Sequence, residues 1–128
     1  MKKVLVLLLL MVSTSVFAEW TKIGENGSLN AYVDFGSIRK SGNKIEMLKL
    51  GDFKAVQQTK DNRYLSTVSI DEYDCEEKKS RLLNFYWYSG NMGEGEVVYS
   101  QSNIKEEYHS IITDTFAEIF FKAACRKK

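Results

Sequence analysis

The chain has 128 residues, of which 44% are hydrophobic and 27% are charged, enough to build the core of one domain. Its 18 basic and 17 acidic side chains give a net charge of +1 at neutral pH. This balance argues against nucleic acid as the main partner, because phosphate binding requires a basic stripe on the surface.

Residues 1–18 have the three-part order of a secretory signal peptide. Two lysines precede an apolar run over residues 4–12, and small side chains stand before the cleavage point. The run is too short for a membrane span, which needs about 20 residues. We therefore predict cleavage before Glu19 and an exported, soluble domain over residues 19–128, without a transmembrane anchor. Loss of the two lysines leaves this domain with a net charge of about −1.

Between the signal and about residue 102, six short β-rich runs alternate with turn residues. Asn26-Gly27 is the strongest hairpin signal, because both residues tolerate the positive φ angles of a two-residue turn. Short connections favour antiparallel pairing of consecutive strands. The glycine-rich segment 90–95 is interpreted as a wide hairpin loop rather than a phosphate-binding loop. The predicted strands are residues 20–23, 29–33, 44–53, 64–75, 81–88 and 96–100.

The apolar period changes to that of a helix near Ser110, and either Ser110 or Thr113 is expected to cap the helix start. The sequence therefore predicts an α+β fold, a six-stranded antiparallel β-sheet with a C-terminal α-helix packed on one face. The apolar residues at helical spacing are Ile112, Phe116, Ile119, Phe120 and Ala123.

Cys75 and Cys125 are the two cysteines of the sequence. In an exported chain without a CxxC motif, an even number of cysteines indicates a structural disulfide. Paired cysteines cannot serve as nucleophiles, and free cysteines together with His109 alone would not fill a zinc shell. We therefore predict one Cys75–Cys125 bridge, no metal site and no cofactor.

No group of residues indicates catalysis. The acidic cluster within residues 71–77 lies beside two lysines and is interpreted as a solvated turn. His109 has no base or nucleophile near it in the sequence and is interpreted as an exposed loop residue. We therefore predict no catalytic residue and a protein that is not an enzyme.

The aromatic strand over residues 82–88 is the most informative segment for function. Phe85 and Trp87 share one face of this strand, and Tyr86 and Tyr88 share the other. Because a helix covers only one face, we expect the tyrosine face to stay uncovered, as is typical of protein interfaces. This face either binds another molecule, closes a homodimer or packs under a curled sheet edge. The candidate binding residues are Tyr86, Tyr88, Leu48 and Leu50.

Several segments together resemble a known family over essentially all of residues 19–128. The most specific segment is Tyr88-Ser89-Gly90-Asn91-Met92-Gly93-Glu94-Gly95-Glu96-Val97-Val98, with the two cysteines in register. On these residues the chain resembles the surface-adhesin protein E-like family of small exported proteins from Gram-negative bacteria. The resemblance implies a six-stranded antiparallel sheet whose C-terminal helix is tied down by Cys75 and Cys125. It also implies a role at the cell surface, binding of host matrix proteins such as vitronectin and laminin, and dimerisation.

Two functional hypotheses from different classes follow. The first is a non-enzymatic envelope protein that binds other macromolecules, with adhesion to host extracellular-matrix proteins as the role that the resemblance implies. The alternative is a soluble periplasmic module that binds a small ligand such as haem or inhibits an attacking hydrolase. Both hypotheses place the protein in the periplasm or at the cell surface of a Gram-negative bacterium. The expected partner is a protein, with a homodimer as a further possibility, and not nucleic acid.

Overall fold

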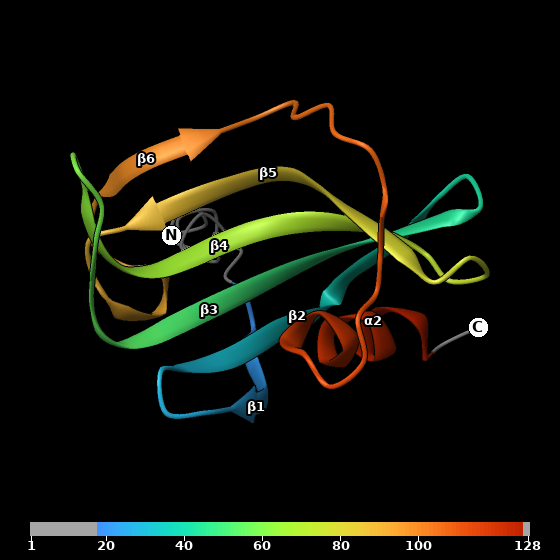
Figure 1. The fold of residues 1–128 in the computed structure, drawn as a ribbon, viewed down its shortest axis with the longest axis horizontal. Helices are drawn as coiled ribbons and strands as arrows, with labels where there is room; N and C mark the ends of the chain where they lie inside the picture. Colours follow the sequence, from blue (N-terminus) through green and yellow to red (C-terminus); the bar gives the residue numbers. More distant parts are fainter. Residues whose placement is uncertain (1–17, 127–128) are drawn as a thin grey trace, which may run out of the picture.

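The structure, a computed structural model, describes residues 18–126, and residues 1–17 of the predicted signal peptide lie outside the described residues. Six strands pair in chain order and antiparallel to form one sheet, which confirms the predicted α+β meander (Figure 1). The elements are β1 (Thr21–Glu25), β2 (Leu29–Ser41), β3 (Lys44–Gln58), β4 (Arg63–Asp74), β5 (Lys79–Tyr88), the short 3₁₀ turn η1 (Asn91–Gly93), β6 (Val97–Gln101), β7 (His109–Ser110) and α2 (Phe116–Cys125).

Tight turns explain why neighbouring strands pair. The Asn26 side chain accepts hydrogen bonds from the backbone N–H of Ser28 and of Leu29, at 2.7 and 2.9 Å, and so closes the predicted β1–β2 hairpin. Gly42 has a φ of 69° in the β2–β3 turn, a conformation that glycine adopts without strain. The third strand is longer than predicted and reaches Gln58, because its hairpin with β4 closes farther along the chain.

The sequence did not predict β7, a two-residue strand that pairs with the start of β5. It belongs to the connecting segment, residues 102–115, which leads from β6 to the helix along the free side of β5 (Figure 1). The backbone N–H of Ile104 donates to the Leu83 carbonyl at 2.9 Å, and the Glu106 carboxylate accepts from the Leu82 N–H at 2.8 Å. The connecting segment therefore occupies the edge of β5 that β6 leaves open.

Helix α2 begins later than predicted. The N-cap is Thr115, whose hydroxyl accepts a hydrogen bond from the Glu118 N–H at 3.3 Å. Capping by Ser110 or Thr113 is wrong, because Ser110 lies in β7 and Asp114 has a left-handed φ of 63° that interrupts any helix through Thr113. Ile112, predicted on the apolar face of the helix, precedes the helix and is 67% exposed.

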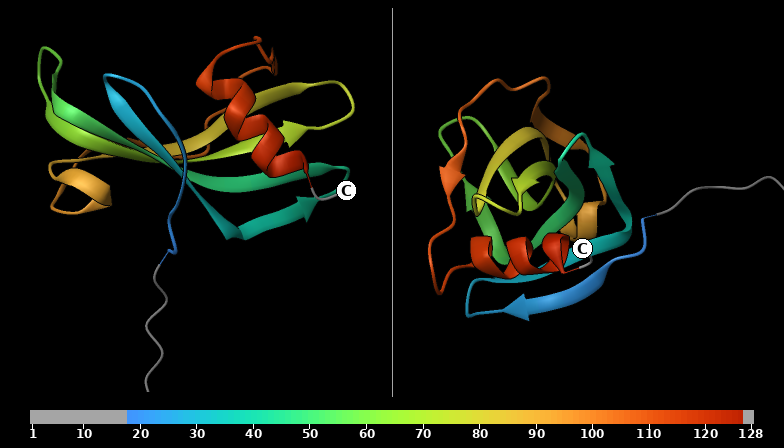
Figure 2. Two further views of the ribbon diagram at one scale, coloured as in Figure 1. Left: turned by 90° about the horizontal axis from the view of Figure 1, so that it is seen from below. Right: turned by 90° about the vertical axis from the view of Figure 1, so that its right-hand side faces the viewer.

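The core lies between α2 and one face of the sheet. Figure 2 shows the helix lying across this face, with the hairpin tips between β1 and β2 and between β3 and β4 curved toward the same side. The predicted disulfide between Cys75 and Cys125 is confirmed, and it joins the end of β4 to the end of the helix. The buried core residues are Ala31, Val33, Met47, Tyr73, Phe120, Ala123 and Ala124.

Candidate functional site

The four candidate binding residues from the sequence share the face of the sheet opposite α2. Leu50 and Tyr86 lie in one row of the sheet through Val68, and Leu48 and Tyr88 lie in the neighbouring rows. Side chains in directly opposed positions of antiparallel strands project from the same face and contact one another. This face is the one on which we expected an open amphipathic patch.

The glycine-rich loop, residues 90–95, covers part of this face. Leu50 is 0% exposed, and a Cβ atom at Gly93 would lie 3.4 Å from its Cδ1 atom and 3.2 Å from Val68 Cγ2. The expectation that Leu50 contributes to an open patch is therefore wrong. Sequence periodicity assigns a residue to a face but does not show that a distant loop folds back over it.

Two buried polar residues, neither of them predicted as site residues, hold the glycine-rich loop in place. The Asp52 carboxylate accepts a hydrogen bond from the Met92 N–H at 2.7 Å. The Ser66 hydroxyl donates to the Gly90 carbonyl at 2.6 Å and accepts from the Gly93 N–H at 2.8 Å. Both residues share the face of Tyr88, which was expected to stay open, and a polar side chain on an open face does not indicate burial, so the sequence carried no signal for them.

The helix side of the sheet carries an aromatic cluster, defined here as Phe53, Tyr64, Phe85, Trp87 and Tyr99. The Trp87 ring stacks on Tyr64 with centroids 4.2 Å apart, and Tyr99 lies 5.0 Å away on its other side. Phe53 and Phe85 extend the cluster at centroid distances of 5.8 Å from Tyr64 and Tyr99. The cluster therefore runs across β3, β4, β5 and β6.

The helix does not lie over this cluster. It packs on the same face as Phe85 and Trp87, as expected, but chiefly against β2 and β3. The aromatic side chains beside it are half-buried, and Tyr99 is 38% exposed. An uncovered aromatic surface was predicted on the tyrosine face alone. The helix face carries one as well, because the helix is narrower than the sheet.

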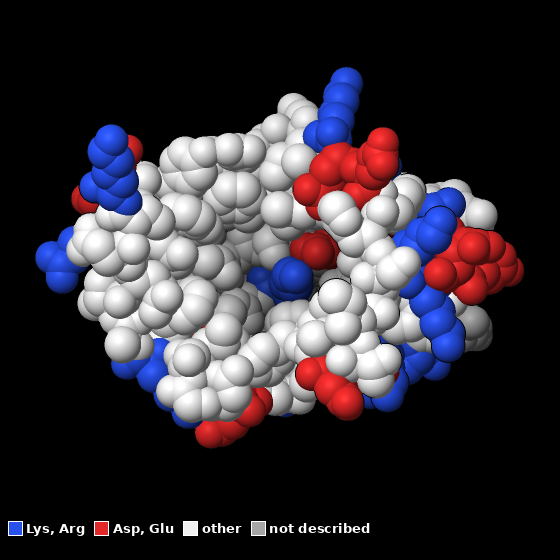
Figure 3. Space-filling model, viewed as in Figure 1, with Lys and Arg blue, Asp and Glu red and all other residues white. Residues whose placement is uncertain are grey.

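A hollow separates the aromatic cluster from α2. Figure 3 shows the molecule hollowed on this side, with basic and acidic side chains at the bottom and uncharged residues around them. The cavity next to the helix measures about 150 Å³, close to the size of one large side chain. Its lining residues are Leu29, Lys49, Gly51, Phe53, Thr67, Ser69, Phe116 and Phe120.

An ion pair lies in this hollow. Lys49 Nζ is 3.2 Å from Asp71 Oδ2 and 4.7 Å from the centroid of the Phe120 ring. Asp71 is buried, and its other carboxylate oxygen accepts a hydrogen bond from the Ser69 hydroxyl at 3.4 Å. Because the two charges compensate each other, the hollow offers an aromatic rim and a neutral, hydrogen-bonding floor.

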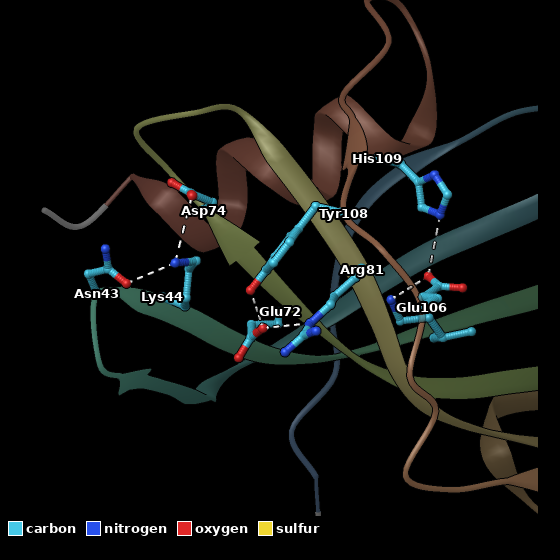
Figure 4. Close-up of polar contacts among 9 residues, drawn as sticks. Asn43, Lys44, Glu72, Asp74, Arg81, Glu106, Tyr108 and His109 are labelled. Atoms are coloured by element: carbon cyan, nitrogen blue, oxygen red, sulfur yellow. Dashed lines mark hydrogen bonds and ion pairs between the residues drawn. The ribbon is translucent and has the colours of Figure 1, made fainter.

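A second polar cluster fastens the connecting segment to the sheet (Figure 4). The Tyr108 hydroxyl donates to the Glu72 carboxylate, which also accepts from Arg81 Nε at 2.8 Å. The Arg81 guanidinium lies 4.7 Å from the Tyr108 ring centroid, and Lys44 lies 5.7 Å from it and 3.8 Å from Asp74. Burial and the hydrogen bond to Glu72 raise the pKa of Tyr108 to about 12. This cluster stabilises the structure. The predicted solvated turn is wrong for Asp71, Glu72 and Asp74, which lie in β4, and is found only at Glu76 and Glu77, which are exposed in the turn after the strand.

The groove between the connecting segment and the sheet is larger, with a volume of about 670 Å³. Its polar lining is balanced, with three basic and three acidic side chains. These are Arg39, Arg81, Lys105, Glu46, Glu106 and Glu107. The balance gives this groove no preference for a ligand of one charge.

Neither a metal centre nor a membrane helix is found within residues 18–126. No three His, Cys, Asp or Glu side chains in this range are grouped so that they could hold a metal ion. None of the helices in the described part of the chain is long and apolar enough to cross a membrane.

Comparison with known proteins identifies the family. The family model of surface-adhesin protein E matches residues 20–126. The chain belongs to the surface-adhesin protein E family. This confirms the resemblance seen in the sequence. No curated protein sequence matches the chain significantly.

Two solved structures of Haemophilus influenzae protein E share the fold. One, from crystal form II, aligns with a TM-score of 0.61 over 89% of this chain and 92% of its own, at 15% sequence identity. The other, a selenomethionine form, aligns with a TM-score of 0.60 over 90% of this chain and 92% of its own, also at 15% identity. At this level of identity the likeness demonstrates the common architecture.

Two of the sequence features on which the resemblance rests have structural roles in this surface-adhesin protein E domain. The two cysteines tie α2 to β4, and the glycines of residues 90–95 allow the loop to approach Leu50. Gly95, at a φ of 87°, would place a Cβ atom 2.4 Å from Ser89 Oγ, so a side chain is excluded there. These residues therefore stabilise the sheet on which the aromatic cluster lies.

Proposed function

We propose that the protein is an exported, non-enzymatic adhesin that binds a protein partner through the aromatic cluster and the hollow beside it. The observation that carries this proposal is the aromatic cluster itself, which crosses four strands next to α2 and is not covered by it. Tyrosine and tryptophan dominate the binding energy of protein interfaces, since they bury large areas with little loss of side-chain entropy.

The hollow beside the aromatic cluster is a second reason to place the centre of a protein interface on this surface. Hot spots of binding lie in pockets that fill with a partner side chain, and a cavity of about 150 Å³ suits an apolar one. The neutral Lys49–Asp71 pair at its floor offers both a donor and an acceptor to the partner. The family membership points in the same direction, because its description is that of a surface adhesin.

The ligands to test first are vitronectin and laminin, the host matrix proteins that the family resemblance implies. Trp87→Ala removes the centre of the aromatic cluster, and we expect an affinity loss of about 30-fold, equivalent to ~2 kcal/mol. Tyr86→Ala is the matched control, because Tyr86 is its neighbour on β5 and projects from the opposite face. Surface plasmon resonance on immobilised matrix protein measures both variants, with circular dichroism to verify folding.

These two variants, with Tyr88→Ala as a third, decide between the two faces of the sheet. If Tyr86→Ala and Tyr88→Ala weaken binding while Trp87→Ala does not, the site is the tyrosine face with Leu48 rather than the aromatic cluster. If the parent protein binds neither matrix protein, adhesion to these two ligands is rejected.

Export and display belong to the same proposal. Cleavage of residues 1–18 before Glu19 would deliver the chain to an oxidising compartment, where a bridge such as Cys75–Cys125 persists. Amino-terminal sequencing of the purified protein tests the cleavage point. Surface protease treatment of intact cells tests display, since an adhesin must be accessible from outside.

A soluble periplasmic module that binds a small ligand or inhibits a hydrolase is the second candidate. The groove of about 670 Å³ between the connecting segment and the sheet favours it, because small-molecule sites have volumes of roughly 300–1,000 Å³. Protein that is released by osmotic shock and resists surface protease would support this role over adhesion.

A further inference from the structure

We propose that the hollow beside α2 is a binding site for a tyrosine side chain of the partner protein. This inference deepens the proposed function, because it rests on the partner being a protein that binds over the hollow. It names the side chain that the walls and the floor of the hollow accept together.

The hollow exists because small residues occupy one row of the sheet. Ala31, Gly51 and Thr67 lie directly opposite one another in β2, β3 and β4. The same row continues with Trp87 and Tyr99 of the aromatic cluster. Gly51 places no side chain between the sheet and α2, and a Cβ atom there would lie 3.3 Å from Thr67 Oγ1. The hollow therefore begins where the large side chains of the aromatic cluster end.

The walls of the hollow suit an aromatic ring. Phe53 of the aromatic cluster faces Phe116 and Phe120 of α2 across it, and all three line the cavity. The two helix rings have centroids 6.5 Å apart and are tilted by 41°, an arrangement in which a further ring packs edge to face. An engineered cavity of about 150 Å³ in another protein binds benzene, and this hollow has about the same volume.

The floor of the hollow excludes a charged side chain. Lys49 Nζ already pairs with Asp71 Oδ2 at 3.2 Å, so the floor carries no net charge. A carboxylate, ammonium or guanidinium from the partner would enter a partly buried site that holds no counter-charge for it. The occupant is therefore a neutral side chain.

The floor also requires a hydrogen-bonding partner. The Ser69 hydroxyl donates to Asp71, so its oxygen is left to accept, whereas the Lys49 ammonium only donates. A phenol hydroxyl matches both, because its single oxygen donates to the first group and accepts from the second. Phenylalanine would leave these groups without water or a partner, and tryptophan only donates. Aliphatic hydroxyls and amides lack the ring that the walls accept.

A second copy of the chain does not supply this tyrosine. Of its seven tyrosines, all within the described residues, Tyr99 is the one exposed side chain, at 38%. Its ring packs on Trp87 with centroids 5.0 Å apart, and insertion elsewhere would break this contact. The other six are buried or half-buried in their own chain and do not project a whole ring outward. The occupant is therefore a residue of a different protein.

The test uses the exported protein with its disulfide intact, labelled with ¹⁵N and ¹³C. The probes are three blocked amino acids, acetyl-tyrosine amide, acetyl-phenylalanine amide and acetyl-tryptophan amide. We expect acetyl-tyrosine amide to bind in the millimolar range and at least fivefold more tightly than the other two. The resonances that shift should be those of Gly51, Thr67 and Phe120, and not that of Tyr86 on the opposite face.

Filling the hollow provides the second measurement. Gly51→Val places two methyl groups in it and should weaken binding of acetyl-tyrosine amide at least tenfold. Ala55→Val is the matched control, because it enlarges an exposed residue of the same strand that does not line the hollow, and it should change binding less than twofold. Circular dichroism establishes that both variants are folded.

Removing the hydroxyl groups of the floor provides the third measurement and keeps the inference testable if the filled variant does not fold. The double variant Thr67→Val with Ser69→Ala leaves the ion pair in place and should reduce the preference for tyrosine over phenylalanine at least threefold. Thr21→Val with Ser100→Ala is the matched control, because neither residue lines the hollow, and it should keep the preference of the parent.

Three results would overturn the inference. They are acetyl-phenylalanine amide binding as tightly as acetyl-tyrosine amide, an unchanged preference in the variant without floor hydroxyls, and a parent dimer in analytical ultracentrifugation that Gly51→Val abolishes. The inference and the proposed function fail separately. Loss of matrix-protein binding in Trp87→Ala but not in Gly51→Val rejects the tyrosine site alone. Absence of any matrix-protein binding rejects the adhesion proposal and leaves the probe results to decide the tyrosine site.

Discussion

Two adjacent carboxylates of β4, Asp71 and Glu72, are buried and project from opposite faces of the sheet. Asp71 pairs with Lys49 of β3, and Glu72 pairs with Arg81 of β5. A buried carboxylate without such a partner is strongly destabilising, so each pair helps to define which strands are neighbours. Glu72 also accepts from Tyr108 and thereby links the sheet to the connecting segment.

The link to Tyr108 leads to a prediction about stability at alkaline pH. Burial and Glu72 raise the pKa of Tyr108 to about 12, above the value of about 10 in an unfolded chain. The folded protein therefore holds this proton more tightly, and the associated stability is complete below pH 10 and lost as the pH rises through 12. We expect Tyr108→Phe to be less stable than the parent at pH 8 by about 1 kcal/mol and to lose less stability above pH 10.

Urea unfolding at pH 8 and pH 11, followed by tryptophan fluorescence, measures this difference. Tyr99→Phe at the sheet edge is the control and should decline as the parent does. Equal declines of the parent and Tyr108→Phe would show that Tyr108 does not carry the alkaline transition.

At the scale of the elements, the strands were predictable because turn residues and apolar runs are local signals. Asn26-Gly27 marked the first hairpin and all six strands were found, but β2 ends at Ser41 rather than Val33 and β3 ends at Gln58 rather than Phe53. The start of α2 was misplaced, because Ser110, Thr113 and Thr115 all fit the composition of a cap. The left-handed backbone at Asp114 separates them, and a sequence does not specify that angle for a non-glycine residue.

The helix start provides a direct test of this distinction. Thr115→Ala removes the hydroxyl that accepts from the Glu118 N–H, and we expect a loss of about 1 kcal/mol in the free energy of unfolding. Thr113→Ala makes the same chemical change at an exposed residue outside the helix and should alter stability by less than about 0.5 kcal/mol. Urea titration of both variants decides, and a larger loss for Thr113→Ala would move the cap to the position predicted from sequence.

At the scale of the whole molecule, the sequence predicted the two layers, a sheet and a helix. It did not predict which parts of the sheet the helix and the loops cover. Alternation along β5 separated Phe85 and Trp87 from Tyr86 and Tyr88, and the structure keeps them on opposite faces. Which parts of each face stay open depends on where α2 crosses the sheet and where the glycine-rich loop returns. Both are set by contacts between residues far apart in the chain, such as Asp52 with Met92, which local patterns do not encode.

The disulfide ties the C-terminal end of α2 to the end of β4, and its removal should affect the whole molecule. Cys75 and Cys125 are 50 positions apart, and closing a loop of this length stabilises a protein by about 4 kcal/mol in chain-entropy models. The helix has ten residues, too few to be stable without tertiary contacts, and it packs on the sheet through buried Phe120 and two alanines with Phe116 and Phe121 beside them.

We therefore expect the double variant Cys75→Ser with Cys125→Ser to lose most of its stability, with amides of α2 exchanging before those of β3 and β4. Hydrogen exchange and urea unfolding measure the two effects, and the parent treated with a reducing agent should reproduce them. Because α2 forms one wall of the hollow beside the aromatic cluster, the reduced protein should also bind its partner more weakly. An unchanged unfolding midpoint in the double variant would contradict the role of the bridge as the tether that positions this wall.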